Sequence, residues 1–430
     1  MIITKRGLVL GTTAVALSTV AVTGAGILLS QSQALVQDSP KEIVDEVWQI
    51  INYQYVDQTF NNTDWLKVRQ EYLEKSYTDK EEAYEAVREM LGKLEDPYTR
   101  FMDPEEFKNM QIDTSGELTG VGIQIAKDEE TDRLLVISPI EDTPAFEVGI
   151  LAKDIIVSID GTDTKGMDVN DAVKLIRGKP GSKVTLTVER NGKKSDYEIT
   201  RARIQIHPVR ASIQDTTIGK VGYIRLTQFS AQASKEMREA IKDLETKQVE
   251  GYVLDLRSNP GGLLYASIDI ARMWLQDGTI VSTVDRQGER DRKLANHNAL
   301  TDKPLVVLVD GGSASASEIL SGALQDNGRA TLVGTQTFGK GLVQSVRSLG
   351  DGSGLAVTIA KYLTPSGRDI NKEGIPPDII IELSEEQRKN LQGDRTLIGT
   401  VQDPQFQKAV DILSDNIQAR GGTNSSLTTK

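Results

Sequence analysis

Two short segments in the last third of the chain hold residues that could perform nucleophilic chemistry. Gly-Gly-Ser-Ala-Ser-Ala-Ser-Glu at 311–318 is rich in serine, and Thr-Phe-Gly-Lys-Gly-Leu-Val-Gln at 337–344 places a lysine between two glycines. The chain has no cysteine and only two histidines, His207 and His297, so few side chains could activate a serine. The pattern raises the question of a Ser-Lys dyad, in which a lysine takes the proton of a serine hydroxyl.

Ser315 is predicted to open a helix directly after a buried strand at 304–310. Its hydroxyl would then lie at the positive end of the helix dipole, where a developing oxyanion is stabilised. A structural role is the alternative, because Ser315-Ala316-Ser317-Glu318 is also a capping box, and most such serines only cap helices. The familiar hydrolase patterns Gly-x-Ser-x-Gly and Ser-x-x-Lys are absent from the chain.

Lys340 shifts the balance toward catalysis. Its flanking glycines allow other backbone to approach closely, and its neighbours Phe338, Leu342 and Val343 are apolar. A lysine with a pKa of about 10.4 cannot act as a base at neutral pH. Lowering that pKa to about 7 requires roughly 4–5 kcal/mol of desolvation or charge repulsion. Apolar surroundings could supply this energy, and a solvated surface lysine is the alternative.

Gln344 lies four residues after Lys340 and could orient the lysine amine. On a straight strand the two residues would lie ~13 Å apart, against ~6 Å on a helical turn. Contact therefore requires a bend in the chain, which we expect at Gly341.

A candidate oxyanion hole lies in the segment Asp-Leu-Arg-Ser-Asn-Pro-Gly-Gly at 255–262. Gly261 and Gly262 would end a strand and leave backbone N–H groups exposed toward a nucleophile on the next strand-to-helix turn. From the sequence alone, a plain strand-to-helix turn without a catalytic role is as well supported as an oxyanion hole.

The residues around these motifs, from about 204 to 383, alternate between strands and helices. Strands are predicted at 251–256, 304–310 and 331–334, and helices at 263–275 and 315–325. This alternation is typical of an α/β fold with a largely parallel sheet, whose functional groups lie at strand-to-helix turns.

After this region, Phe406, Val410 and Leu413 mark a short amphipathic helix. The composition of the polar tail at 421–430 predicts disorder.

The segment before the α/β region, from 39 to about 110, has a helical pattern. Its first helix is predicted to begin at a capping box, Ser39-Pro40-Lys41-Glu42, and carries an apolar stripe at helical spacing. A second helix is predicted from Thr78 to the helix-ending pair Asp96-Pro97. We expect these helices to brace a larger body.

The N-terminus has the pattern of an export signal. Lys5 and Arg6 precede an uncharged apolar run at 7–29, and Ser32-Gln33-Ala34 offers a cleavage site after Ala34. The run is near the ~20 residues that span a bilayer, so a retained membrane anchor is the alternative to a cleaved signal peptide. In both cases the mature chain is expected to work outside the cytoplasm.

Composition excludes several classes of function. The net charge of −12 and the pI near 5 argue against nucleic acid or anionic lipid as the main partner. The absence of cysteine excludes disulfides, thiolate metal sites and cysteine catalysis. Two isolated histidines make a histidine-rich metal site unexpected. No cofactor is predicted, and the sequence indicates no oligomeric state.

Residues from about 113 to 203 resemble a PDZ domain of the bacterial protease type. Short strands, a helix at 169–177 and an Asn191-Gly192 hairpin turn follow in the expected order. In this resemblance Leu118-Thr119-Gly120-Val121-Gly122 is the carboxylate loop. Its backbone N–H groups would bind a C-terminal carboxylate, and the next strand would pair with the incoming peptide. The implied peptide-binding residues are Leu118, Gly120, Val121, Gly122, Ile123 and Val173. For the loop alone, an ordinary glycine-rich turn is the alternative.

Taken together, the motifs are similar to those of the C-terminal processing serine peptidases, also called tail-specific proteases. The similarity covers nearly the whole mature chain and includes Leu-Glu-Asp-Pro-Tyr-Thr-Arg at 94–100 and Tyr-Leu-Thr-Pro-Ser-Gly-Arg at 362–368. One local departure is Asp310, where the family often has asparagine. The resemblance implies an α/β, ClpP/crotonase-like protease core with an inserted PDZ domain and flanking helical segments.

The resemblance also implies the roles of the site residues. Ser315 would be the nucleophile, Lys340 the base and Gln344 the third member. The oxyanion would be bound by the amides of Ala316 and of a glycine, Gly261 or Gly262. The chain would be an exported serine endopeptidase, located in the periplasm or thylakoid lumen, that binds and cleaves protein C-terminal tails. In photosynthetic members the substrate is the precursor of a photosystem II reaction-centre protein.

Two alternatives from other classes remain at this point. One is a catalytically silent PDZ scaffold or chaperone on a protease fold, and the other is a crotonase-like acyl enzyme. The expected organisation is a signal peptide or anchor at 1–34, helices at 35–112, a PDZ domain at 113–204, the protease core at 205–385, and a C-terminal helix and tail at 386–430.

Overall fold

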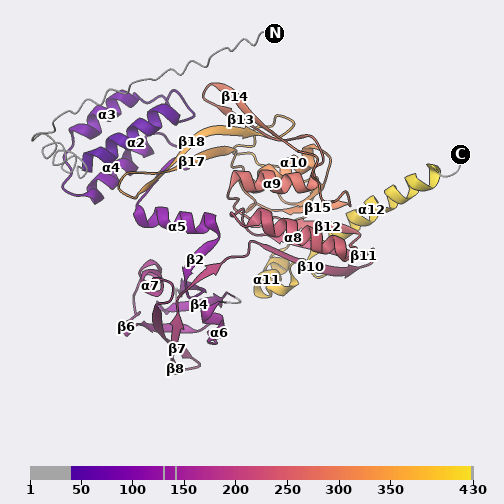
Figure 1. Cartoon of the computed structure of the whole chain (residues 1–430), viewed down its shortest axis with the longest axis horizontal. Helices are drawn as coiled ribbons and strands as arrows, with labels where there is room; N and C mark the ends of the chain where they lie inside the picture. Colours follow the sequence, from indigo (N-terminus) through magenta and orange to yellow (C-terminus); the bar gives the residue numbers. More distant parts are fainter. Residues whose placement is uncertain (1–39, 129–130, 141–142, 428–430) are drawn as a thin grey trace, which may run out of the picture.

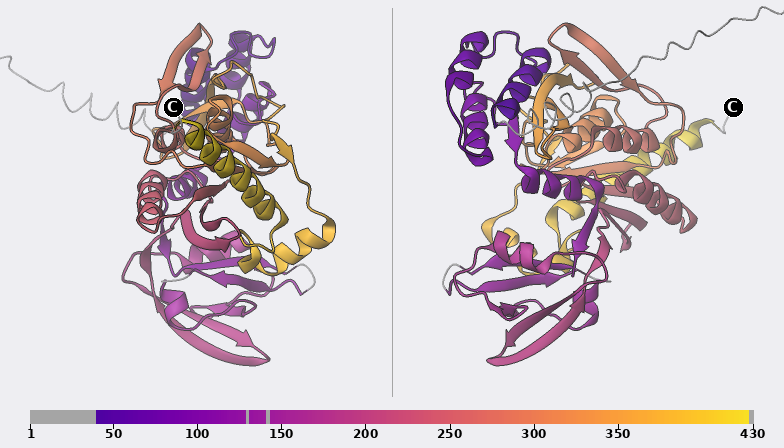
Figure 2. Two further views of the ribbon diagram at one scale, coloured as in Figure 1. Left: turned by 90° about the vertical axis from the view of Figure 1, so that its right-hand side faces the viewer. Right: turned by 60° about the vertical axis from the view of Figure 1, so that its left-hand side comes forward.

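The computed structural model describes residues 40–128, 131–140 and 143–427. Figure 1 shows a helical bundle at one end, an α/β core, and a smaller domain of strands below them. The two other views in Figure 2 show helix α5 (Pro104–Ser115) between the bundle and the smaller domain. The predicted export signal at 1–34 lies outside the described residues.

The bundle contains three helices, α2 (Pro40–Gln54), α3 (Trp65–Glu74) and α4 (Lys80–Gly92). The apolar stripe of α2 is buried as its spacing predicted, at Val44, Val47, Trp48 and Ile51. These side chains pack in one cluster with residues of strand β18 (Gly354–Leu363). The bundle therefore braces the α/β core, as expected.

The core is built on a six-stranded sheet in the order β10–β11–β12–β15–β16–β19. Its strands are β10 (Val209–Thr216), β11 (Gly219–Leu226), β12 (Gly251–Asp255), β15 (Leu305–Val309), β16 (Thr331–Gly334) and β19 (Ile379–Ile380). All neighbouring pairs from β11 to β19 are parallel, and only β10 pairs antiparallel. The predicted parallel α/β sheet is thus confirmed.

Helices cover both faces of this sheet. Along β15, Val307 and Val309 pack with α8 (Ala233–Thr246), α9 (Leu264–Trp274) and α10 (Ala316–Asp326), while Val306 and Leu308 pack against α12 (Pro404–Leu427). Alternate residues of a strand point to opposite faces of the sheet. Because both faces are buried here, the sequence of β15 is a continuous apolar run.

A second sheet connects the bundle to the core. It runs β1–β18–β13–β14, with β17 also paired to β18. The strands are β1 (Arg100–Met102), β13 (Thr279–Asp285), β14 (Gly288–Leu294) and β17 (Leu342–Ser348). The short strand β1 was not foreseen, and it carries the end of the helical segment into this second sheet.

The inserted domain contains the elements that the PDZ resemblance implied. They are β3 (Ile123–Lys127), β4 (Leu134–Pro139), α6 (Pro144–Glu147), β5 (Ile155–Ile159), β6 (Thr162–Asp163), α7 (Val169–Ile176), β7 (Lys183–Arg190) and β8 (Lys193–Thr200). The Asn191-Gly192 turn has the positive φ angles, 53° and 75°, that its hairpin requires. An antiparallel pair, β2 (Glu117–Gly120) and β9 (Ala202–Gln205), joins the domain to the core.

The C-terminal segment contains α11 (Glu385–Gly393), the 3₁₀ turn η1 (Arg395–Leu397) and α12. Phe406, Val410 and Leu413 are buried, as their spacing predicted. Helix α12 continues to Leu427, so the prediction of disorder from residue 421 is wrong for most of that tail. Within the described ranges, no helix combines the length and the apolar character needed to cross a membrane.

Candidate active site

Ser315 lies at the N-terminal cap of α10, as the sequence predicted, after the short turn 310–314 that follows β15. Its φ of 54° is unusual for a residue with a side chain. Such strained backbone persists only where the surroundings hold it in place, and it clusters at functional sites. The Ser315 amide donates a hydrogen bond of 2.8 Å to Glu318 Oε2.

The same glutamate oxygen holds the backbone of Lys340. The Lys340 amide donates to Glu318 Oε2 at 2.9 Å, while Glu318 Oε1 accepts from the Gly339 amide at 2.7 Å and from Thr337 Oγ1 at 2.6 Å. Glu318 is fully buried. One buried carboxylate therefore joins the serine turn to the lysine segment, and the structure brings the two predicted residues into one site.

The Lys340 side chain lies in partly buried surroundings. Its Nζ is 4.7 Å from the ring centroid of Tyr98. Burial lowers the pKa of Lys340, and the charge of Arg100 acts in the same direction. The carboxylates of Asp96 and Glu318 oppose this effect, yet the net shift of the Lys340 pKa is downward. This is the direction that a lysine base requires.

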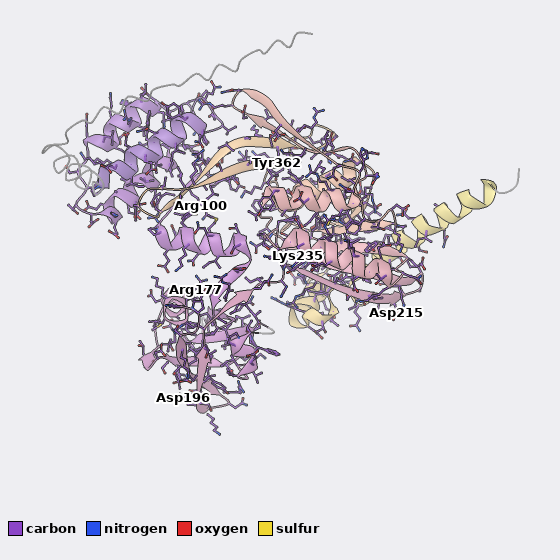
Figure 3. All side chains as sticks on the ribbon, in the orientation of Figure 1. Arg100, Arg177, Asp196, Asp215, Lys235 and Tyr362 are labelled. Atoms are coloured by element: carbon purple, nitrogen blue, oxygen red, sulfur yellow. The ribbon has the colours of Figure 1, made fainter. Side chains whose placement is uncertain are left out.

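Tyr362 in β18 is a neighbour of both residues. Its hydroxyl donates to the Lys340 carbonyl. Burial raises the pKa of Tyr362 well above its usual value, Glu318 adds to this, and the nearby Ser315 hydroxyl opposes it. The phenol therefore stays protonated and can act only as a neutral donor or acceptor beside the serine. Figure 3 places Tyr362 in the core and Arg100 at its border with the bundle.

Gln344 contacts Thr358 rather than the Lys340 amine that it was expected to orient. Its Nε2 donates to Thr358 Oγ1 at 3.5 Å, in a strand pair that is irregular between Val343 and Gln344. Thr358 in turn is bonded to Thr99, whose hydroxyl donates to Asp96 Oδ2 at 2.7 Å. This series of hydrogen bonds connects Gln344 to the 94–100 segment.

The glycine turn after β12 lies directly against the serine. A Cβ atom added to Gly261 would lie 2.9 Å from Ser315 Cβ and 3.0 Å from the Ala316 amide nitrogen. A Cβ on Gly262 would lie 2.3 Å from the Phe229 carbonyl oxygen. Both glycines are therefore required by close approach. However, the Gly261 amide donates to Asn259 Oδ1 at 2.9 Å, so it is already engaged.

Asp310 links the two turns. Its Oδ1 accepts from the Ser258 amide at 2.7 Å and the Gly312 amide at 2.9 Å, and its Oδ2 lies 3.2 Å from Ser258 Oγ. Aspartate at this position, where related sequences often have asparagine, therefore still accepts hydrogen bonds from the Ser258 and Gly312 amides.

The six predicted peptide-binding residues of the PDZ domain come together. A cavity of about 90 Å³ is lined by Leu118, Gly120, Val121, Gly122, Ile123 and Val173, among others. The proposed loop is only partly free, because Leu118–Gly120 already pairs with β9.

Several residues near Ser315 and Lys340 were given no role by the sequence. Asp96, Tyr98 and Arg100 come from the far end of the bundle segment, and Glu318 and Tyr362 were noted only within motifs. A signal was present, because polar and aromatic residues cluster immediately after the helix-ending pair Asp96-Pro97. What the sequence lacked was the pairing of β1 with β18, which places this cluster beside Lys340.

Comparisons with known proteins agree with this geometry. Residues 220–381 match Peptidase family S41, and residues 120–200 match the PDZ domain. The chain is 45% identical over 403 residues to the carboxyl-terminal-processing protease of Synechocystis sp., with 92% of each chain covered. It is 41% identical over 372 residues to the chloroplastic carboxyl-terminal-processing peptidase 2 of Arabidopsis thaliana, covering 82% of this chain and 72% of the relative.

A solved structure, the photosystem II D1 C-terminal processing protease, is also similar. It shares 37% sequence identity with a TM-score of 0.57, and the match covers 86% of this chain and 99% of that one. The predicted fold class and enzyme class are therefore confirmed, and the silent scaffold and crotonase-like alternatives are no longer needed. The chain belongs to the carboxyl-terminal-processing proteases of peptidase family S41, serine peptidases that here carry a PDZ domain.

Proposed function

We propose that Ser315 is the nucleophile of this protease and that Lys340 is its general base. The observation that carries the proposal is the buried Glu318 carboxylate, whose one oxygen accepts hydrogen bonds from the backbones of both residues. The lowered pKa of Lys340 supports it independently, because a deprotonated amine is the form that can accept a proton.

The reaction then follows two steps. Ser315 Oγ attacks the scissile carbonyl carbon while its proton passes to Lys340 Nζ. The C–N bond breaks, the lysine returns the proton to the leaving amine, and an acyl-enzyme remains. Water attacks the ester with the same lysine as base, which releases the new carboxylate and restores the serine.

Backbone amides are the proposed oxyanion donors. The Ala316 amide is at the first position of α10, where an N–H group has no acceptor within the helix. Gly262 is the glycine we favour as the second donor, because the amide of Gly261 is held by Asn259. Gln344 would orient the lysine amine only after leaving Thr358, so we assign it a secondary role.

The PDZ domain is proposed to bind the free C-terminal tail of a protein substrate. Its cavity gathers the apolar Leu118, Ile123 and Val173 around the glycines of the loop, together with Arg177. Apolar walls suit a terminal side chain, while backbone N–H groups suit its carboxylate.

We further propose that the protein acts outside the cytoplasm, in the periplasm or thylakoid lumen. The basic, apolar and small-residue pattern of 1–34 supports export with a signal peptide, or with the 7–29 segment as a membrane anchor. A photosystem II reaction-centre precursor is the proposed substrate, supported by the 37% identity to a photosystem II D1 processing protease.

The test compares three single variants on a peptide with the C-terminal tail of a photosystem II D1 precursor, followed by mass spectrometry. Ser315→Ala and Lys340→Ala are expected to abolish cleavage and to change the free energy of unfolding by only ~1–2 kcal/mol. Ser313→Ala is the control: it loses a hydrogen bond of 2.8 Å to the Leu256 carbonyl but keeps the nucleophile. An inactive Ser313→Ala beside an active Ser315→Ala would overturn the assignment.

A further inference from the structure

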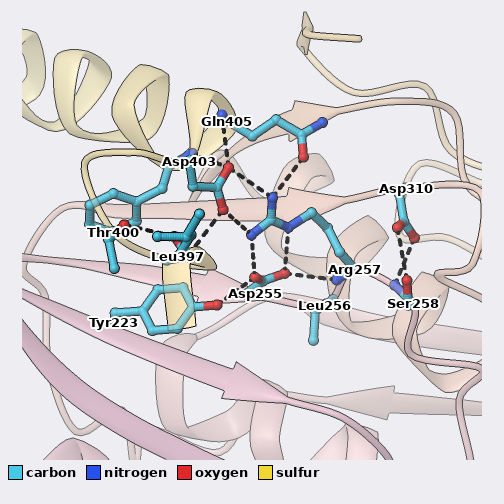
Figure 4. A network of polar contacts seen from close by, with 12 residues as sticks. Tyr223, Asp255, Leu256, Arg257, Ser258, Asp310, Leu397, Thr400, Asp403 and Gln405 are labelled. Carbon is cyan, nitrogen blue, oxygen red and sulfur yellow. Dashed lines mark hydrogen bonds and ion pairs between the residues drawn. The ribbon is translucent and has the colours of Figure 1, made fainter. Parts of the chain in front are cut away.

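A buried polar network lies between the end of β12 and the start of α12 (Figure 4). Its members are each less than a tenth exposed: Tyr223, Asp255, Arg257, Asp403 and Gln405. None of them belongs to the catalytic pair. A buried polar network makes a structure rigid only when every donor and acceptor in it is hydrogen-bonded. The partners of each group therefore show whether this network can hold its surroundings in place.

Arg257 is the centre of the network. It donates to Asp255 through Nε at 2.9 Å and Nη2 at 2.6 Å, and to Asp403 through Nη1 at 3.1 Å and Nη2 at 2.7 Å. Nη1 also donates to Gln405 Oε1 at 2.8 Å. The Arg257 guanidinium is thus held by Asp255 on one side and by Asp403 and Gln405 on the other. Burial alone would raise the pKa of Asp255, but the charge and hydrogen bonds of Arg257, together with the Tyr223 hydroxyl and the charge of Arg225, lower that pKa.

Asp403 ties the C-terminal segment to this arginine. Its Oδ1 accepts from the Gln405 amide at 3.1 Å, and its Oδ2 accepts from the Gly399 amide at 3.1 Å. Gly399 has a φ of 74° and packs so closely on Tyr223 that an added Cβ would lie 2.3 Å from the ring. The Tyr223 hydroxyl donates to Asp255 Oδ2 at 2.6 Å. The chain entering α12 therefore contacts the end of β12 by two routes.

The arginine is followed directly by the turn that frames the nucleophile. The Leu256 carbonyl accepts from Ser313 Oγ at 2.8 Å, and the Asn259 carbonyl accepts from the Ala314 amide at 3.0 Å and from Ser317 Oγ at 2.9 Å. A shift of the backbone around Arg257 would therefore move both the glycine turn and the residues on either side of Ser315.

We propose that Asp403 is a positioning residue for the reaction. By holding Arg257 from the C-terminal side, it fixes the 256–262 turn at the distance from Ser315 that oxyanion binding requires. The C-terminal helix is then part of the active-site scaffold. This inference rests on the proposed role of Ser315. Misplacement of a catalytic group by about 1 Å can cost a hundredfold in rate. Loss of the Asp403–Arg257 contact is therefore expected to lower kcat.

The test is Asp403→Asn in the full chain, assayed with the same D1 tail peptide. An amide can still cap α12, but its NH₂ group must face either Arg257 Nη2 and the Gly399 amide, or Arg257 Nη1 and the Gln405 amide. All of these are donors. We expect kcat to fall roughly ten- to a hundredfold with KM nearly unchanged. A peptide boronate, which forms a tetrahedral adduct with the serine, should lose affinity by the same factor.

Val410→Ala is the matched control, because it loosens the same helix on the same sheet without touching Arg257. Its kcat should stay within about threefold of wild type. If Asp403→Asn fails to fold, Gln405→Met takes its place. It removes the bond from Arg257 and the bond to the Ile381 carbonyl, and it leaves the cap made by Asp403 intact. A fall of about three- to tenfold in kcat is expected for that variant.

Two results would overturn the inference. The first is a kcat loss in Val410→Ala equal to that in Asp403→Asn, which would show a stability effect alone. The second is an unchanged kcat in a folded Asp403→Asn or Gln405→Met. Failure of the proposed mechanism looks different, because wild-type protein would then bind the boronate no better than Ser315→Ala does.

Discussion

If Lys340 is the general base, as proposed, its environment sets the pH range of activity. A general base must be neutral, so kcat/KM should then rise with pH along a limb set by the Lys340 pKa, which lies below its usual value. The groups that face this lysine are Arg100, Asp96, Glu318 and Tyr98. Among them, Arg100 is the cation whose charge favours the neutral amine.

Arg100→Gln is therefore predicted to move the limb to higher pH. Removal of the positive charge makes protonated Lys340 less unfavourable, which raises its pKa. Because Arg100 is exposed and its charge is screened by solvent, we expect this shift to be small. The measurement is kcat/KM between pH 6 and 10, with Arg203→Gln on β9 as the control. A limb that stays in place or moves to lower pH would show that Arg100 does not act on the base.

At the scale of single elements, local patterns predicted most of what the structure contains. The apolar run of β15, the stripe of α2 and the Asn191-Gly192 turn follow from period and turn chemistry, which depend only on near neighbours. Strand β1 was missed because three residues carry no periodic signal. The continuation of α12 past residue 421 was missed because the polar composition there gave no sign of helix.

The glycines of the PDZ loop give an element-scale prediction. A Cβ on Gly122 would lie 2.2 Å from Thr143 Oγ1, and its φ is 84°, whereas a Cβ on Gly120 meets nothing closer than 3.6 Å. Gly122→Ala should therefore destabilise the PDZ domain by about 2 kcal/mol or more, and Gly120→Ala by less than about 1 kcal/mol.

Hydrogen exchange of the amides in β3 and α7 measures this difference within the full chain. Faster exchange in Gly122→Ala, confined to the PDZ domain, is the expected result. Equal protection in the two variants would contradict the close contact with Thr143. The comparison also selects Gly120 as the position at which a larger side chain tests peptide binding without loss of the fold.

At the scale of the whole molecule, the site is assembled from parts that lie far apart in the sequence. The bundle segment supplies Tyr98 and Arg100, two strand ends supply the serine and glycine turns, and the segment that enters α12 supplies Asp403, the proposed positioning residue. The sequence predicted Ser315 and Lys340 because their motifs are local. The roles of Tyr98, Arg100 and Asp403 depend on pairings across the fold, which no local pattern encodes.

The last prediction concerns the separate roles of the two domains, tail binding by the PDZ domain and cleavage by the core. If the PDZ cavity binds a free carboxylate, amidation of a tail peptide's C-terminus removes a charge-assisted contact worth ~1.5–3 kcal/mol. Affinity for Ser315→Ala protein, measured by fluorescence anisotropy, should then weaken roughly ten- to a hundredfold. Cleavage of the same peptide by the wild type should require a correspondingly higher concentration, because tail binding delivers the scissile bond to the serine.

A control separates recognition from chemistry. Amidation of an internal glutamate side chain, a change to glutamine that leaves the terminal carboxylate free, alters peptide charge equally and should leave affinity within about threefold. Arg177, which lines the cavity and also bonds Asn109 on α5, is the charged side chain available to the terminal carboxylate. An amidated tail bound as tightly as the free acid would show that this cavity does not recognise the C-terminal carboxylate, and delivery to Ser315 would then depend on the core alone.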